Sequence, residues 1–178
     1  MKKHKNKNGK ADGWNHEILR INICIVVDSL RKHRNVFVLD MDMSTPVEMN
    51  QEKISAFTQK LASMEKEEGC DLDYMITDEG NAKYKMGLVF GGNKPDNVSK
   101  HIEKTKEALQ YVIGSESMAN TRIDKSTEGV LVKSKDVWKE RNVDYDEAIR
   151  QLNLLAKEDK ADGKKGKDFF CSRTEIEV

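Results

Sequence analysis

The sequence has little that would mark an exported or membrane-bound protein. Of its 178 residues only 2 are proline and 3 are cysteine. Cys24, Cys70 and Cys171 form neither an even set nor a CxxC pair, which is typical of reduced thiols in a cytoplasm. The chain contains no run of about 18 apolar residues that would form a membrane-spanning helix, and its basic amino terminus lacks the apolar region of a signal peptide. We therefore expect a cytoplasmic protein with no membrane partner.

An excess of either charge is also missing. Lys and Arg number 31, Asp and Glu also number 31, and the formal net charge at pH 7 is zero. This balance excludes a polycation that coats nucleic acid through bulk charge, so any such binding needs a local cluster of cations. The length suits one domain with its own core. We expect a basic, flexible tail at residues 1–14 and a single domain at residues 15–178.

The common catalytic motifs are absent as well. The chain has no phosphate-binding P-loop, no G-x-S-x-G elbow and no H-E-x-x-H helix. Its four histidines are scattered, without the spacing of a metal site. Asp40 and Asp42 lie two apart on a predicted strand, so their carboxylates share a face and are candidate ligands for Mg²⁺ or Mn²⁺. A solvent-facing edge or a salt bridge to lysine explains the same pair, and we expect no cofactor.

Apolar periodicity predicts an α+β fold, in which helices flank an antiparallel sheet of about five strands. The expected helices begin near Asn15, after Pro46, near Pro95 and at Asp144. The expected strands span residues 35–43, 72–77 and 84–90, then a hairpin within 119–135 and a last strand at 169–173. The predicted core contains Val38 or Leu39, Phe57, Leu61, Leu88, Ile102, Leu109, Ile149 and Leu152.

Two segments predict which side chains face inward. In the first helix the recurrence of apolar residues places Leu19, Ile23, Val26, Val27 and Leu30 on one face. In the strand at 35–43, alternation separates two sets of side chains. One set is Phe37, Leu39, Met41 and Met43, and the other is Val38, Asp40 and Asp42.

Charge is unevenly spread along the chain. Residues 65–79 carry seven acids and a single lysine. This stretch is either a solvated helix end and loop or a DNA-like surface directed at a basic protein groove. Residues 160–167 form a basic, glycine-containing turn before Phe169 and Phe170. Its Lys164 and Lys165 are candidates for phosphate contacts, although a solvated turn followed by a core strand explains the same residues.

Three segments also stand out by their order and spacing. They are VFVLDMDM at 36–43, YMITDEGNAKYKMGLVFGGNKPDNVSKHIEKTKEAL at 74–109 and NLLAKEDKADGKKGKDFFCSR at 153–173. Together they resemble the replication-protein family of filamentous phages and prophages, the YagK/YfjJ-like domain. The resemblance implies a Rep-like sheet related to rolling-circle (HUH) initiators, which nick DNA. In that chemistry a histidine pair holds a divalent cation and a tyrosine attacks the scissile phosphate.

The positions that carry this chemistry are substituted here. The family's His-Tyr-His falls on Lys83, Tyr84 and Lys85, and a protonated lysine does not ligate a metal. The family's tyrosine nucleophile falls on Leu154, which has no nucleophilic atom. The resemblance therefore implies a catalytically silent Rep-like protein of a phage or other mobile element.

We expect this protein to bind DNA, single-stranded or origin-like, as a replication accessory, competitor or regulator. The candidate nucleic-acid contacts are Lys83, Lys85, Lys157, Arg173, Lys164 and Lys165. One alternative is a phage inhibitor of a host defence or replication protein, such as an anti-CRISPR factor, that uses the acidic stretch. The other alternative is an active nicking enzyme in which Tyr111 or Tyr145 replaces the nucleophile and Asp40 and Asp42 hold the metal.

Overall fold

The structure, a computed structural model, describes residues 3–4, 13–136, 142–157 and 167–173. Its α-helices are α1 (His16–Lys32), α2 (Gln51–Glu67), α3 (Val98–Met118) and α4 (Val143–Asn153). Its strands are β1 (Lys3–His4), β2 (Asn35–Ser44), β3 (Asp71–Gly80), β4 (Lys83–Gly92), β5 (Arg122–Lys125), β6 (Val130–Lys133) and β7 (Phe169–Cys171). Two short 3₁₀-helices are η1 (Ser134–Asp136) and η2 (Leu154–Ala156).

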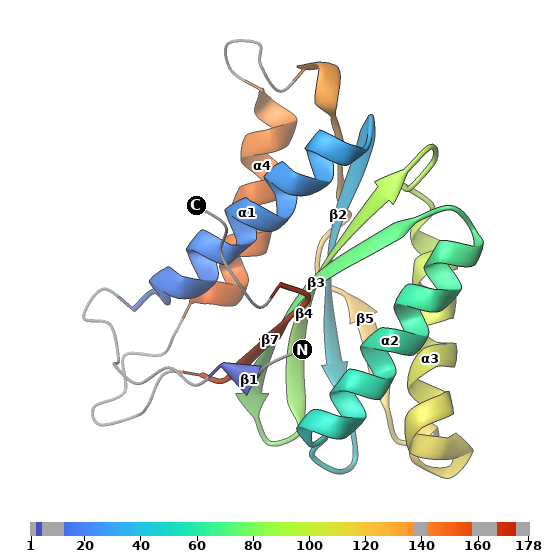
Figure 1. The fold of residues 1–178 in the computed structure, drawn as a ribbon. Coiled ribbons are helices and arrows are strands. Elements are labelled where there is room, and N and C mark those ends of the chain that lie inside the picture. The colour runs from blue at the N-terminus through green and yellow to red at the C-terminus, as the bar shows by residue number, and fades with distance from the viewer. Residues whose placement is uncertain (1–2, 5–12, 137–141, 158–166, 174–178) are drawn as a thin grey trace.

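The seven described strands form one antiparallel sheet. Their order is β1-β7-β3-β4-β2-β5, and β6 also pairs with β2. Figure 1 shows α1 and α4 on one face of this sheet and α2 and α3 on the other. The predicted α+β class, an antiparallel sheet flanked by helices, is therefore confirmed. β1 lies within the predicted basic tail and pairs with β7 at the edge of the sheet.

Asparagine side chains determine where the four α-helices begin. Asn15, Asn50, Asn97 and Asn142 are the N-caps, and each accepts a hydrogen bond from a backbone N–H in the first turn of its helix. This bond satisfies a donor that has no partner within the helix. The fourth helix therefore begins next to Asn142 rather than at Asp144, which lies in its first turn.

β2 and β4 form the centre of the sheet. They pair over their full lengths, from Asn35 opposite Gly92 to Ser44 opposite Lys83. Asn81 and Ala82 connect β3 to β4. Both have positive φ, as a two-residue hairpin turn requires. The strands predicted at 35–43, 72–77 and 84–90 thus match β2, β3 and β4.

Two apolar layers cover the two faces of the sheet. Phe37, Leu39, Met41 and Met43 pack against α2 and α3 in one layer, and Val36 and Val38 join α1 and α4 in the other. The alternation predicted for residues 35–43 is therefore confirmed. Of the predicted core, Ile102 and Ile149 are partly buried and the remaining residues are buried.

The inner face predicted for the first helix is wrong by about one position. α1 buries Ile18, Ile21 and Ile25, whereas Ile23 is 43% exposed. Val26 and Leu30 are buried as predicted. The error has a physical origin, since the segment INICIVV is apolar around most of the helix and two adjacent stripes satisfy the same periodicity.

The hairpin predicted within residues 119–135 is also wrong. β5 and β6 both pair with β2, one after the other along the same edge, and not with each other. The residues between them bulge outward opposite Asp40, whose backbone N–H donates to Thr127 Oγ1 and whose carbonyl accepts from the Ser126 N–H. Gly129 closes the bulge with φ +81°, and a Cβ there would lie 2.2 Å from the Phe37 ring.

Replacing Leu109 by Ala tests the packing of α3. Leu109 is fully buried between α3 and the sheet, so Leu109→Ala is expected to lower the free energy of unfolding by about 2–5 kcal/mol. Urea denaturation measures the loss. Glu107→Ala, at an exposed position of the same helix, is the control and should change stability little. A loss below about 1 kcal/mol for Leu109→Ala would contradict this packing.

Candidate functional site

Two glycines of β4 let α1 and α4 approach one half of the sheet. A Cβ on Gly87 would lie 2.4 Å from Leu152 Cδ2 of α4, and a Cβ on Gly91 would lie 2.2 Å from His33 Cδ2 at the end of α1. A larger residue at either position would force the facing side chain of Leu152 or His33 to move. The helices therefore cover the half of the face that contains these glycines.

Beyond Gly87 the same face carries polar side chains from three strands. We call this set the open patch: Asp42, Ser44, Lys83, Lys85, Arg122 and Asp124. Ser44 is partly exposed and the other five are exposed. None of the six side chains forms a hydrogen bond or ion pair with another residue of the described ranges.

The strand register arranges the open patch in two rows. The outer row contains Arg122, Ser44 and Lys83, which are direct cross-strand neighbours in that order. The inner row contains Asp124, Asp42 and Lys85 in the same sense. The outer row therefore places a hydroxyl between two cations, whereas the inner row places two carboxylates opposite each other, an arrangement that is unfavourable for the sheet.

Asp40 lies one step deeper than the open patch. Its side chain is 3% exposed, and its Oδ1 is buried with no hydrogen-bond partner in the described part of the chain. Burial raises the pKa of Asp40 well above its ordinary value, the charge of Asp42 raises it further, and Lys85 opposes both effects. The predicted carboxylate pair thus shares a face, but Asp40 is buried and Asp42 is exposed.

The described residues do not bring together a metal centre. No group of three His, Cys, Asp or Glu side chains within them has the geometry to hold a metal ion. Asp42 has Asp124 as its cross-strand neighbour and Lys85 on its other side. The Asp40 and Asp42 site for Mg²⁺ or Mn²⁺ therefore stays a prediction from the sequence.

The other predicted contacts occupy different places. Lys157 is exposed and follows η2, whose Leu155 side chain packs next to Gly87 at the border of the open patch. Arg173 lies on the other half of the sheet and pairs with Asp28 of α1, at 2.5 Å, and with Asp73 of β3, at 3.8 Å. Lys164 and Lys165 lie outside the described residues.

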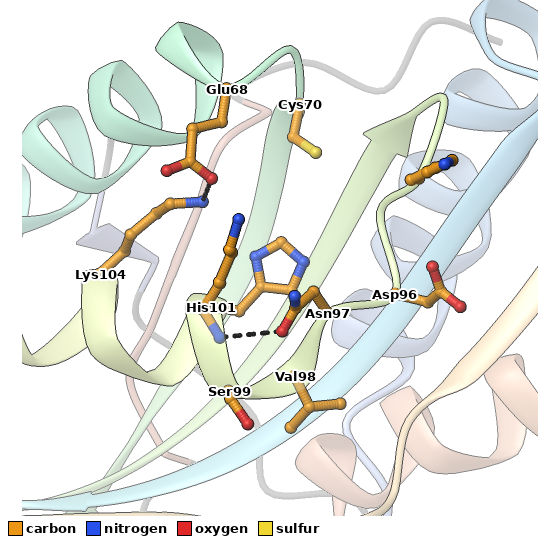
Figure 2. A pocket seen from close by; sticks show the side chains of 10 residues that line it. Glu68, Cys70, Asp96, Asn97, Val98, Ser99, His101 and Lys104 are labelled. Carbon is orange, nitrogen blue, oxygen red and sulfur yellow. Dashed lines mark hydrogen bonds and ion pairs between the residues drawn. The ribbon is translucent and has the colours of Figure 1, made fainter.

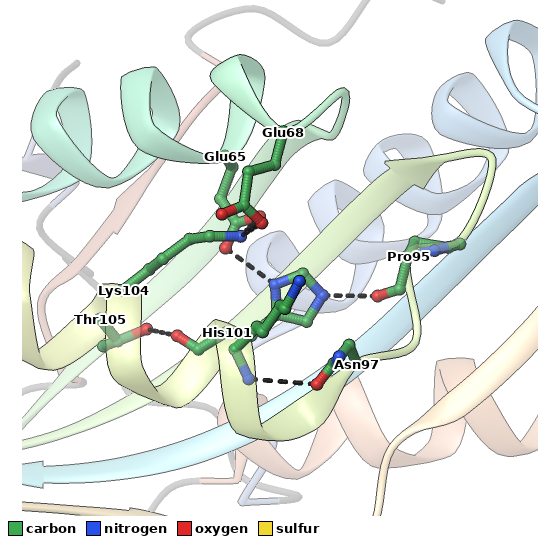
Figure 3. Close-up of polar contacts among 8 residues, drawn as sticks. Glu65, Glu68, Pro95, Asn97, His101, Lys104 and Thr105 are labelled. Carbon is green, nitrogen blue, oxygen red and sulfur yellow. Dashed lines mark hydrogen bonds and ion pairs between the residues drawn. The ribbon is translucent and has the colours of Figure 1, made fainter.

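Most acids of the stretch at 65–79 have polar partners within the fold. Six of its seven acids form hydrogen bonds or ion pairs with described residues, and Glu67 is the exception. Figure 3 shows Glu65 and Glu68 beside Lys104. Asp71 pairs with His33, Asp73 with Ser172, Asp78 with the Gly80 N–H, and Glu79 with Lys167. Lys104 and Lys167 therefore offset part of its charge, while Glu67, Glu68 and Asp71 remain exposed at the surface.

A second polar site lies between α2 and α3, on the other face of the sheet. We call Glu65, His101 and Lys104 the buried ion cluster, since their exposed fractions are 0%, 2% and 8%. The His101 ring stacks on Phe90 with a centroid distance of 3.6 Å. Glu68 and Cys70 border the adjacent cavity, of about 700 Å³, which Figure 2 shows from close by.

Sequence reasoning missed several of these residues. Arg122 and Ser44 become neighbours in the open patch because β5 pairs with the end of β2. The predicted hairpin paired the segment of β5 with that of β6 instead. His101 and Glu65 are 36 positions apart, so no local motif joins them. A histidine among the apolar residues of a predicted helix was the only signal available.

Comparison with family models, curated protein sequences and solved structures finds no match for this chain. The resemblance to phage replication proteins therefore stays a prediction. Among the described residues, no helix combines the length and the apolar character needed to cross a membrane.

Replacing Asp40 by Asn tests its protonation. Because its pKa is higher in the folded protein than in the unfolded chain, the folded state holds more protons and stability falls as pH rises from about 4 to the folded-state value. Asp40→Asn should remove this fall. The free energy of unfolding of the variant, relative to that of the original protein, should therefore increase with pH. Urea denaturation over a pH series measures the difference, with the exposed Asp96→Asn as control. If the stabilities of Asp40→Asn and the original protein change with pH in parallel, the pKa of Asp40 is not raised in the folded state.

Proposed function

We propose that the protein binds nucleic acid through the phosphate backbone, at the open patch. The observation that supports this proposal is the outer row, in which the Ser44 hydroxyl lies between Arg122 and Lys83. Arginine, lysine and serine side chains are common donors to phosphate oxygens, and charge-assisted bonds of this kind are the strong ones. The exposed cations of the outer row have no internal carboxylate partner in the described residues.

Within the patch, the two rows have different roles in this proposal. Lys83 and Arg122 supply the affinity. Lys85 contributes less because it neighbours Asp42, whose carboxylate offsets its charge. Lys157, which is exposed and follows Leu155 by two residues, is a further candidate contact in this proposal. Arg173, once a candidate contact, pairs with Asp28 and Asp73 instead and has no part in the site.

In this proposal the protein binds without cleaving, as a Rep-like replication accessory, competitor or regulator of a mobile element. The resemblance places lysines where metal-binding histidines would lie and Leu154 where the nucleophilic tyrosine would lie. Leu154 begins η2 and is 40% exposed. An accessible position on the helix side of the sheet therefore carries an inert side chain. The nicking reaction of the family therefore has no nucleophile at this position, and DNA is proposed as a ligand only.

Incubation with DNA and divalent metal tests whether the protein nicks. A labelled single strand kept with the protein and Mg²⁺ or Mn²⁺ is expected to stay intact and to carry no covalent protein adduct, since the tyrosine position is Leu154. Denaturing gel electrophoresis detects both products. An adduct that disappears in Tyr145→Phe or Tyr111→Phe would instead establish the active-enzyme alternative.

Charge reversal in the outer row tests the binding proposal. Lys83→Glu combined with Arg122→Glu is expected to weaken binding to all DNA sequences alike, because phosphate contacts carry affinity and not sequence information. The slope of log affinity against log salt should become shallower by about 1 to 2. Mobility-shift titrations at several salt concentrations measure both effects.

The matched control for this test is Lys53→Glu combined with Lys106→Glu. It makes the same change of charge at exposed positions of α2 and α3, on the other face. Circular dichroism establishes first that both double variants are folded. The proposal fails if the outer-row variant binds DNA with the affinity and salt slope of the original protein, or if the control weakens binding equally.

A further inference from the structure

Both ring nitrogens of His101 lie within hydrogen-bonding distance of oxygen atoms. Figure 3 shows the ring between Glu65 of α2 and Pro95 of the loop that joins β4 to α3. Nδ1 is 2.8 Å from Glu65 Oε1, and Nε2 is 2.5 Å from the Pro95 carbonyl oxygen. Both neighbours are acceptors. A neutral imidazole carries a single N–H and can donate to only one of them, whereas the imidazolium donates to both.

The charges around the ring agree with the doubly protonated form. Lys104 Nζ lies 3.3 Å from Glu65 Oε2 and 2.5 Å from Glu68 Oε2. With His101 as a cation, two carboxylates and two cations balance, so the buried carboxylate of Glu65 is fully compensated. With His101 neutral, Glu65 loses one of its two cationic neighbours and keeps only Lys104, which it shares with Glu68.

The remaining groups near the ring come from every element packed against it. β2 and β4 contribute the aromatic rings of Phe37 and Phe90. The residue before β3 contributes the Cys70 thiol, whose pKa is raised by burial and by Glu65 and lowered by Lys104. The helix and loop around the adjacent cavity contribute Lys94, Asp96 and Lys100.

We propose that His101 is a proton-operated latch that holds the β4–α3 loop, residues 93–97, against α2. In the closed state Nδ1–H donates to Glu65 and Nε2–H donates to Pro95. At higher pH a solvent base takes the Nε2 proton, because the Nδ1 proton faces the carboxylate. The Nε2 lone pair then faces the lone pairs of the Pro95 carbonyl, the contact becomes repulsive, and the loop separates from the ring.

Opening of the latch changes the cavity beside it. The loop and the first turn of α3 supply Lys94, Asn97 and Lys100 to the cavity wall, and Cys70, just before β3, lines the same space. Figure 2 shows Cys70, His101 and Asn97 around this space. Cys70 is 7% exposed in the closed structure. Release of the loop is therefore expected to expose the Cys70 thiol, which makes Cys70 a reporter of the open state.

Thiol labelling tests the latch. All variants are labelled at the same pH, so that a change of pH does not itself alter the fraction of ionised thiol. His101→Gln keeps a single donor group and removes the cation. In a Cys24→Ser background, Cys70 of His101→Gln is expected to react about tenfold or more faster than in the parent, the factor expected from loss of one charge-assisted hydrogen bond. Mass spectrometry of peptides separates labelling at Cys70 from labelling at Cys171.

Cys171 distinguishes local opening from unfolding. It is fully buried on β7, and its pKa is raised to about 11, chiefly by burial. Leu109→Ala in the same Cys24→Ser background is the matched control for lost stability. Fast labelling of Cys70 with slow labelling of Cys171 supports the latch. Equal labelling of both thiols, or equally fast Cys70 labelling in the Leu109→Ala control, would refute it.

A titration of the unaltered protein provides the second measurement. Long-range ¹⁵N–¹H spectra report which ring nitrogens of His101 carry protons, and backbone amide spectra report the loop. Lys94, Asp96 and Asn97 are expected to shift along the same pH curve as the loss of the Nε2 proton. The latch is refuted if that proton is lost while the loop amides stay unchanged, or if the ring carries one proton at every pH at which the loop is closed.

Discussion

The continuous pairing of β2 with β4 is the constraint on which the rest of the structure depends. It runs from Asn35 opposite Gly92 to Ser44 opposite Lys83 without a shift in register. Because side chains alternate between faces, a slip by one residue would exchange every inward and outward side chain of one strand. The apolar layer under α2 and α3, the glycines under α1 and α4, and the two rows of the open patch all require this register.

Local patterns predicted the parts of the fold that depend on neighbours in the sequence. The alternation of VFVLDMDM assigned Asp40 and Asp42 to one face correctly, because successive side chains of a strand point to opposite faces. The same reasoning failed in α1, where Ile23 and Ile25 are equally apolar and only the packing partner selects between them. It also missed Arg122, because the pairing of β5 with β2 joins residues far apart in the chain. Register between distant strands is decided by tertiary packing, which short patterns do not contain.

The acidic stretch illustrates the same limit for electrostatics. Its seven acids in fifteen residues suggest a strongly negative surface, yet His33, Lys104 and Lys167 reach most of them from other parts of the chain. The zero net charge of the protein is thus realised partly as internal pairs. The outer row of the open patch differs from single exposed cations elsewhere because the strand register places Arg122 and Lys83 on either side of one hydroxyl.

The bulge between β5 and β6 has a further consequence for the behaviour of the chain at high concentration. A long, flat outer strand offers a template on which a second molecule can add its own strand. Here the outer strand beside β2 is divided into two pieces of four residues, separated by residues 126–129. Very short edge strands of this kind discourage the addition of a strand from another chain. The interruption opposite Asp40 therefore makes this edge of the sheet a poor template for self-association and fibril growth.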